Sequence, residues 1–565
     1  MTSFYLLDAP YSGADVFLHH CEIHSKGEIK RYRDTLTFDA DNSTINVSSI
    51  SPEFCAQIHQ TVASRQLGIL VKDPAIRLAQ AYFVRQKLGK AKVSFAEYFS
   101  TPSRLNIYTQ MLHGHKLEDF GFVGVFERFN SSLLLAKQWL NNDLRIQQYF
   151  DITAELEHVV ELLTVEHLAA IRTLHAQDYE LYDRALALVN ERFDRQRPQQ
   201  TLRVPKQKEV IIHVGPPKTG TSAIQKWLNE NRDSLARSGI YYPPHSTDTN
   251  GVSSGNFLSV LSPCKENNYY RLDPDKFQSL LDELKLMPNQ TLLLSSEMFH
   301  NHLLDFFQFL PNAKYVFYIR HPIDLIESSY HQEVKRHRRT TNFRMPEVLR
   351  FNRLCGFINV CAELKIKPTL RFYDVGLLTG VDLITDFVDM LELTEQPTST
   401  SQKVNSRFGF GELELMRECN SFLSDHLLSK LDLWLQQQSQ SKPSFTLVSK
   451  VQSDQARHYL VKQINALVKI SPTLFSTNDL VKKLEKLALL ETPRPYFDQS
   501  NGKQEAGHVW NILKRKELSL AGDIVKQYRQ HMSTQPDTKN SNLFKWTTLD
   551  QVRLKFSTFF KRFQR

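Results

Sequence analysis

The chain has 565 residues, a formal net charge of +9 and six cysteines. This length predicts two or more domains with sizeable cores, and the modest positive charge favours anionic ligands without by itself indicating nucleic acid. The sequence contains no stretch of eighteen apolar residues, no basic N-terminal leader and no CxxC pair, so we expect no membrane span, no signal peptide and a reducing, cytoplasmic compartment.

The N-terminal region begins with an apolar run from Phe4, which a turn at residues 10–13 interrupts. A second apolar run ends at Lys72 and continues through Asp73-Pro74 to a helical pattern. The polar segment 192–200 then predicts a linker. The two apolar runs, each followed by a turn or a helical pattern, have counterparts in the centre of the chain.

The most distinctive segment is residues 208–228, KEVIIHVGPPKTGTSAIQKWL. An apolar run, a glycine-containing loop and a restart of apolar residues at helical spacing predict a strand, a loop and a helix. This arrangement directs backbone N–H groups and the positive helix end at an anion. Gly215 and Gly220 keep the separation of a Walker A loop, but Thr221 stands where that loop has its lysine, and Lys218 lies inside the loop.

Two later apolar runs also end in residues that carry chemistry. Residues 291–296 predict a strand that leads to Glu297, and residues 314–319 predict a strand that leads to Arg320. Pro322 suits the first position of the helix that follows, where its missing N–H costs nothing. The carboxylate and the guanidinium are therefore expected at strand ends beside the loop.

The loop and the Arg320 segment together resemble two elements of sulfotransferases that use PAPS (3′-phosphoadenosine 5′-phosphosulfate). Pro-Lys-Thr-Gly-Thr-Ser resembles the loop that holds the 5′-phosphosulfate, and the 3′-phosphate element has an Arg, a Pro, a Ser eight residues after the Arg and a Tyr two further on. PAPS carries a 3′-phosphate that ATP lacks, so a second anion site is required. The resemblance implies these nucleotide-binding residues: Pro217, Lys218, Thr219, Gly220, Thr221, Ser222, Arg320 and Ser328.

The resemblance also implies a reaction, the transfer of a sulfuryl group from PAPS to a hydroxyl or amine of a carbohydrate or glycolipid, without a metal ion. Lys218 would stabilise the charge that develops on the leaving 5′-phosphate. Glu297 would take the acceptor proton, with His300 and His331 as alternatives because imidazole titrates near neutral pH. Two other functions fit the same sequence: a P-loop kinase or NTPase, and a non-catalytic scaffold that binds PAP, the desulfated nucleotide.

The N-terminal region resembles a degenerate copy of the central one. Residues 4–17 align with residues 211–224, with Tyr11 in place of the lysine and Asp15 at the predicted helix start. Lys72 and Gln80 stand where the second element has Arg and Ser. Because an acid at a helix N-terminus repels a sulfate, we predict that this copy does not bind PAPS.

The predicted fold is α/β, with mostly parallel P-loop-type sheets flanked by helices. It comprises two tandem sulfotransferase-like domains, residues 1–200 and 201–430, and a helical extension, residues 431–565.

The sequence says less about the acceptor substrate than about the nucleotide. Residues 335–353 hold seven Lys or Arg against one Glu, a segment that could bind an anionic sugar chain, close over the nucleotide or form a solvated basic face. By family order, the glycine-rich loop 250–256 would border the acceptor. The basic, aromatic tail at 551–565 could contact an acidic membrane surface or pack as a terminal helix. No nucleic acid partner is predicted.

Overall fold

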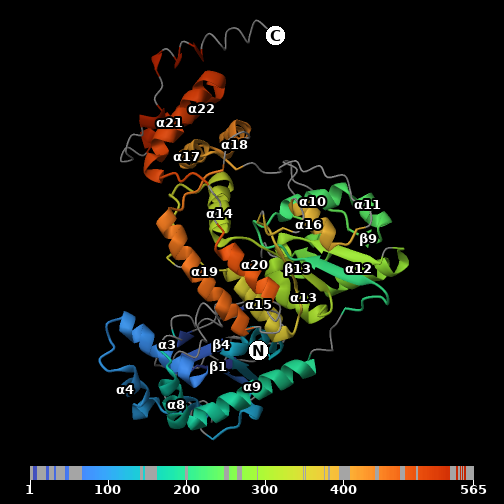
Figure 1. Ribbon diagram of the computed structural model, residues 1–565, viewed down its shortest axis with the longest axis vertical. Helices are drawn as coiled ribbons and strands as arrows, with labels where there is room; N and C mark the ends of the chain where they lie inside the picture. The colour runs from blue at the N-terminus through green and yellow to red at the C-terminus, as the bar shows by residue number, and fades with distance from the viewer. Residues whose placement is uncertain are drawn as a thin grey trace.

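The computed structural model is a mixed α/β fold with two five-stranded parallel sheets, flanked by helices (Figure 1). The α/β class predicted from the sequence is confirmed. The structure describes residues 4–8, 21–23, 31–32, 45–49, 66–112, 114–139, 144–146, 159, 162–196, 202–246, 254–263, 270–288, 290–347, 349, 351–374, 376–378, 382–393, 407–439, 444–470, 478–490, 494–534, 542–544, 547–548, 550–551 and 553–554.

The central sheet has the strand order β14-β13-β8-β12-β9. Every neighbouring pair is parallel, with Thr291 opposite Glu209 and Lys314 opposite Ile211. Because parallel strands end at the same edge, the residues that follow β8, β12 and β13 meet there. The strands are β8 (Glu209–His213), β9 (Ile240–Tyr241), β12 (Thr291–Ser295), β13 (Lys314–Ile319) and β14 (Thr369–Phe372).

Both faces of the central sheet are apolar, as expected of a parallel sheet covered on each side. Ile211, Leu293 and Val316 belong to one buried cluster, whereas Ile212 and Leu294 belong to another. The first cluster includes residues of α10 (Thr221–Glu230), α11 (Arg232–Arg237) and α16 (Leu383–Met390); the second includes residues of α12 (Pro274–Leu286), α13 (Leu303–Phe309) and α15 (Asn352–Leu364).

The first sheet has the order β3-β4-β1-β5-β6 and is also entirely parallel. The two sheets have the same connectivity. The chain runs from the central strand (β1 or β8) to an edge strand (β3 or β9), returns to the strand between them (β4 or β12), and then forms the two strands on the other side (β5 and β6, or β13 and β14). The strands are β1 (Phe4–Asp8), β3 (Arg31–Tyr32), β4 (Ile45–Ser49), β5 (Leu67–Val71) and β6 (Phe122–Val125); the helices α3 (Pro74–Lys87), α6 (Phe129–Trp139), α8 (Val165–Leu174) and α9 (Ala176–Gln196) accompany them.

The linker predicted at residues 192–200 is wrong in its first half, because α9 continues to Gln196. Val189 is buried and Phe193 packs against the same core. Apolar residues at helical spacing therefore continue the helix into a segment that is polar in composition. Residues 197–201 lie outside the described part of the chain.

A buried carboxylate joins the two sheet units. Glu363, near the end of α15, accepts hydrogen bonds from the backbone N–H groups of Asn130 (3.4 Å) and Ser131 (2.8 Å) at the start of α6. It also accepts from the Asn130 amide (2.8 Å) and the Ser131 hydroxyl (3.0 Å). The carboxylate therefore caps a helix of the first unit, and one continuous apolar cluster includes residues of both units.

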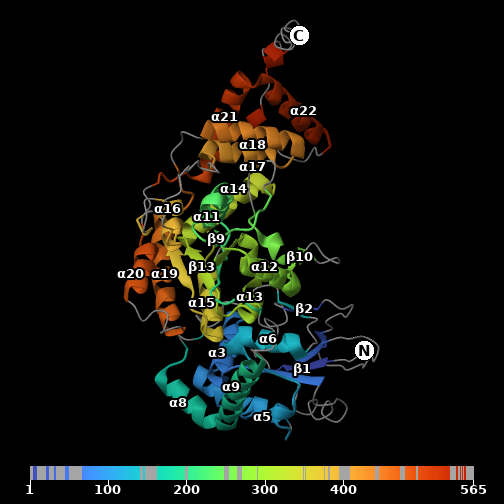
Figure 2. The same ribbon diagram turned by 90° about the vertical axis from the view of Figure 1, so that its right-hand side faces the viewer.

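The C-terminal helices divide into two sets, as Figures 1 and 2 show. The first set surrounds Trp510, and its core includes residues from Phe408 onward. The predicted domain boundary at residue 430 therefore falls inside this set, within the helix Asp425–Ser439. The second set packs beside α15. The first comprises α17 (Phe410–Cys419), α18 (Asp425–Ser439), α21 (Gly502–Lys516) and α22 (Leu518–Thr534); the second comprises α19 (Lys450–Ile470) and α20 (Asn478–Ala488).

None of the helices in the described residues combines the length and apolar character that a membrane crossing requires. Most of the predicted basic tail at 551–565 lies outside those residues.

Candidate functional site

The predicted anion loop, residues 214–220, connects β8 to α10 at the carboxyl edge of the central sheet. Three of its residues, Gly215, Lys218 and Gly220, have positive φ angles of 59°, 74° and 84°. A Cβ atom on Gly220 would lie 2.1 Å from Leu383 Cδ2, so only glycine fits the close approach of the loop to the segment after β14. The loop therefore keeps a tight, specific path into the helix N-terminus.

Two arginines from outside the loop hold its backbone carbonyls. Arg320, directly after β13, donates from Nη1 to the carbonyl of Lys218, and Arg353 of α15 donates to the carbonyl of Pro217 at 3.0 Å. Arg320 also lies over the ring of Tyr373, 4.4 Å from its centroid. Because these carbonyls point toward the arginines, the opposite side of the loop is left for N–H donors. The bond from Arg320 to Lys218 also places the two predicted motifs in direct contact.

The threonine hydroxyls, expected to face the anion, donate within the loop. Thr219 Oγ1 donates to the carbonyl of Pro216 at 2.7 Å, and Thr221 Oγ1 donates to the same carbonyl at 3.3 Å. Ser222 is partly buried in the first turn of α10. The hydroxyls thus brace the loop in this structure.

The charge around the loop is strongly positive. Burial lowers the pKa of the Lys218 ammonium, and Arg320, Lys335 and Arg353 lower it further, whereas Glu297 opposes them. Clustered cations repel one another, so an incoming anion would relieve an existing repulsion. The Nε atom of Arg320 is buried and has no hydrogen-bond partner within the described residues. The site is therefore suited to a polyanionic ligand.

Glu297 lies beside the loop, as predicted. It begins the 3₁₀ helix Glu297–His302 directly after β12, and its Cα would be 3.1 Å from a Cβ placed on Gly215. The two alternative bases differ from it. Burial lowers the pKa of His300 and of His331 to about 3, so both imidazoles are neutral and only weakly basic at neutral pH. Burial thus disfavours the two histidines as bases, and Glu297 is the candidate that stands beside the loop.

The second predicted element is α14 (Pro322–Arg336), which begins with its proline in the first turn, as expected. Asp324, Glu327, Ser328 and His331 recur at intervals of three and four and share one face of this helix. Cations from distant segments surround this face. Arg494 donates to Asp324 at 2.6 Å and to Glu327 at 2.9 Å.

Arg407, from the segment that precedes α17, belongs to the same cluster. Burial lowers its pKa, and Arg320 lowers it further. Its charge also contributes to the low pKa of His331, as does that of Lys218. The predicted Ser328 therefore belongs to the helix face that these cations approach.

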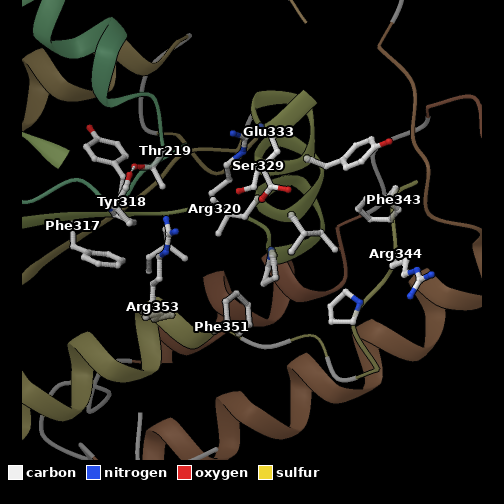
Figure 3. Close-up of a pocket in the computed structure, with 18 of the residues that line it drawn as sticks. Thr219, Phe317, Tyr318, Arg320, Ser329, Glu333, Phe343, Arg344, Phe351 and Arg353 are labelled. Atoms are coloured by element: carbon white, nitrogen blue, oxygen red, sulfur yellow. Dashed lines mark hydrogen bonds between the residues drawn. The ribbon is translucent and has the colours of Figure 1, made fainter. Parts of the chain in front are cut away.

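A cavity of about 290 Å³ runs along the opposite face of α14 (Figure 3). It starts at Pro216, Thr219 and Arg320 and ends at Arg339, Phe343 and Arg344. Ser329 and Glu333 line it from α14, and Phe351 and Arg353 lie across from them. Ser328, Glu297 and His300 are not among the lining residues.

The loop predicted to border the acceptor, residues 250–256, is described only from Ser254 onward. There Asn256 acts as a structural clamp: its side chain donates to the Leu293 carbonyl at 3.2 Å and accepts from the Ser295 N–H at 2.8 Å. A Cβ on Gly255 would lie 1.9 Å from the Ser295 carbonyl. This part of the loop is therefore fastened to the end of β12.

The counterpart of the second element in the first sheet is closed by its own side chains. Lys72 follows β5 and is almost fully buried; its ammonium donates to Gln80 at 2.7 Å and lies 3.5 Å from the centroid of the Phe126 ring. The two residues aligned with Arg320 and Ser328 thus meet each other. Tyr11 and Asp15 lie outside the described residues.

Sequence reasoning missed Arg407 and Arg494, which stand in no recognisable motif and reach the site only through the packing of the C-terminal segments. Arg353 was included in the basic segment, but no role was assigned to it. No three His, Cys, Asp or Glu side chains in the described residues are placed to hold a metal ion.

Comparison with known proteins finds no matching family model, no matching curated protein and no matching solved structure.

Proposed function

We propose that the chain is a PAPS-dependent sulfotransferase whose nucleotide site lies at the carboxyl edge of the central sheet. The observation that carries the proposal is the contact between two anion-binding elements on adjacent strands, made by Arg320 on the carbonyl of Lys218. A nucleotide with a 5′-phosphosulfate and a 3′-phosphate needs two such elements side by side.

The donor set fits that ligand. Lys218 and the N–H groups of the loop would hold the 5′-phosphosulfate, while Arg320, Ser328 and Arg407 would hold the 3′-phosphate. The Nε of Arg320 is buried and lacks a hydrogen-bond partner among the residues that the structure describes, which supports this assignment because such a group is normally paired.

The reaction is an in-line displacement at sulfur. Glu297 takes the proton of the acceptor hydroxyl or amine while the acceptor atom forms a bond to sulfur, and the bond from sulfur to the 5′-phosphate oxygen breaks with its electron pair remaining on that oxygen. Lys218 and the loop N–H groups neutralise the charge that this oxygen gains. The acceptor class that we propose is a carbohydrate or glycolipid.

We also propose that the first sheet unit is a duplicate that has lost nucleotide binding. Its strand order matches that of the central sheet, and Lys72 and Gln80 occupy the aligned positions of the second element. A buried lysine that is already hydrogen-bonded and stacked on an aromatic ring offers little to a phosphate.

The test is calorimetric titration with PAP, followed by transfer from radiolabelled PAPS to a panel of glycans. One PAP site per chain is expected, with affinity at least 10-fold weaker in Lys218→Ala and Arg320→Ala, since each change removes a charge-assisted contact. Lys226→Ala, which removes a lysine of α10 outside the loop, is the matched control. Failure to bind PAP, together with magnesium-dependent ATP binding, would instead support a kinase or NTPase.

A further inference from the structure

The ring of Tyr373 contacts both predicted anion-binding elements of the central unit. Arg320 and Tyr373 directly follow β13 and β14, whose last residues pair in the sheet. The guanidinium of Arg320 lies over the Tyr373 ring, 4.4 Å from its centroid. The same ring packs against the loop, since a Cβ atom on Gly220 would lie 2.8 Å from Tyr373 Cε2. One partly buried ring thus joins the loop to the strand-end arginine.

The first sheet unit repeats this arrangement with different side chains. Lys72 and Phe126 directly follow β5 and β6, the strands that match β13 and β14 in the strand order, and the last residues of β5 and β6 also pair. The Lys72 ammonium lies 3.5 Å from the centroid of the Phe126 ring. A cation over an aromatic ring therefore occurs at the same two strand ends in both units. Because Phe126 has no hydroxyl, the contact requires only the face of the ring.

An acid follows the ring in both units and holds the backbone beside the cation. The Asp374 carboxylate accepts a hydrogen bond from the N–H of His321 at 2.9 Å. The Glu127 carboxylate accepts one from the N–H of Asp73 at 3.1 Å. Each donor is the residue directly after the strand-end cation, so the backbone at that cation is fixed in the same way in both units.

The charge of Arg320 is already partly balanced by acids. Burial and Asp324 raise the pKa of Asp374, and the charge of Arg320 opposes them, so the guanidinium lies in the field of both carboxylates. Its Nη1 donates to the carbonyl of Lys218, whereas its Nε is buried without a hydrogen-bond partner among the described residues. The orientation of the guanidinium therefore matters more than its charge alone, because a phosphate is bound through N–H groups that face it.

We propose that Tyr373 is a positioning residue, whose ring orients Arg320 toward the 3′-phosphate and thereby sets the preference for PAP over AMP, which lacks that phosphate. The inference rests on the proposed nucleotide function and adds a specificity-determining residue to it. The ring acts by limiting the rotation of the arginine before the ligand arrives. An arginine without this support would lose more side-chain freedom on binding, which weakens the contact.

The test is calorimetric titration of the full chain with PAP and with AMP, and its readout is the ratio of the two affinities. The wild type is expected to bind PAP more tightly. Tyr373→Leu should lower the ratio by roughly 3-fold to 30-fold, the range that a cation–π contact supplies. Tyr373→Met, a second variant without a ring, should do the same, whereas Tyr373→Phe should keep the ratio.

The control is Tyr241→Leu, which removes a partly buried ring from β9 at the edge of the same sheet. It should leave the ratio unchanged, and thermal melting checks the folding of every variant.

A double-mutant cycle tests whether the ring acts through Arg320. In the Arg320→Ala background, Tyr373→Leu should change the ratio no further, because the group that the ring positions is gone. A merely structural change would instead lower the affinities for PAP and AMP together and leave their ratio as it was.

Three results would overturn the inference. Equal losses of PAP and AMP affinity in Tyr373→Leu would reduce the ring to a support of the loop. A fall in the ratio that persists in the Arg320→Ala background would mean that the ring meets the nucleotide directly. A fall in Tyr373→Phe would assign the effect to the hydroxyl. A wild type that binds neither nucleotide would, by contrast, refute the nucleotide site itself.

Discussion

At the scale of single residues, the site distinguishes the Glu297 carboxylate from the two histidines that are the alternative bases, His300 and His331. Glu297 sits where β12 ends beside the loop, whereas His300 and His331 are buried and have pKa values near 3. A base with so low a pKa accepts a proton poorly at neutral pH. The carboxylate is therefore the residue on which turnover is expected to depend.

Glu297→Gln should lower the turnover of sulfuryl transfer by about 10²-fold or more, because the amide keeps the shape and loses the basicity. PAP affinity should stay close to that of the wild type. The measurement is steady-state transfer from labelled PAPS beside PAP calorimetry, with Glu209→Gln, at the amino end of β8, as the control. Normal turnover in Glu297→Gln would return the role of base to a histidine.

At the scale of elements, α14 is held from two sides. Its Asp324 and Glu327 are bound to Arg494, and Glu327 also accepts from the Thr446 hydroxyl at 2.6 Å and from the Leu447 N–H at 2.7 Å. The helix that presents Ser328 is thus fixed by segments more than a hundred residues away. An ion cluster of this kind is costly to break because it leaves buried charges unpaired.

Arg494→Ala should destabilise the fold by about 3–5 kcal/mol, the usual scale for removing one partner of a buried ion pair. PAP affinity should fall as well, because the released helix carries Ser328 and begins two residues after Arg320. Urea unfolding and calorimetry measure the two effects, and Arg237→Ala, at an exposed position of α11, is the control. An unchanged midpoint would mean that Asp324 and Glu327 find other partners.

Much of the central sheet follows from the sequence, since β13 and the start of α14 coincide with the apolar run 314–319 and its proline. Local periodicity determines such elements, and glycine spacing determines the loop. What the sequence could not supply is contact between segments remote from each other: Arg353 on Pro217, Arg494 on α14, and the cavity itself. These depend on tertiary packing, which leaves no local pattern.

At the scale of the whole molecule, the two sheet units behave as one body. Glu363 links them through four hydrogen bonds to Asn130 and Ser131, burial raises its pKa, and the apolar cluster around it continues across the junction. A shared core of this kind predicts cooperative unfolding.

Glu363→Ala should leave the N–H groups of Asn130 and Ser131 without their acceptor and cost about 2–4 kcal/mol. Denaturant unfolding should change from one transition to two, as the units separate before the second melts. Glu180→Ala, at an exposed position of α9, should retain the wild-type curve. A single transition at the wild-type midpoint in Glu363→Ala would show that the apolar contacts suffice.

Acid should destabilise the molecule through its buried histidines. Burial lowers the pKa of His213, His300 and His331 to about 3 and that of His321 to about 4, below the ordinary value of 6.5. The unfolded chain therefore binds more protons than the folded one between about pH 4 and 6.5, so stability falls as the pH falls through this window.

Each such group contributes about 1.4 kcal/mol per pH unit. Asp374 and Glu127 act in the opposite direction, because burial raises the pKa of Asp374 to about 6 and that of Glu127 to about 7. The expected net slope is about 3 kcal/mol per pH unit near pH 5. Urea unfolding at pH 7, 6 and 5 measures it, and a stability that stays flat over this range would contradict the burial of neutral imidazoles.

The helix α15 has a consequence for how the chain can evolve. At one end Arg353 holds the carbonyl of Pro217, and about 15 Å further on Glu363 caps a helix of the first unit. A chain that loses the first unit leaves that carboxylate, and the apolar surface around it, without cover, on the helix that supports the loop. If only the second unit binds a nucleotide, as proposed, the first unit could not be deleted without harm to the unit that carries the site, so its sequence could change by substitution but not by deletion.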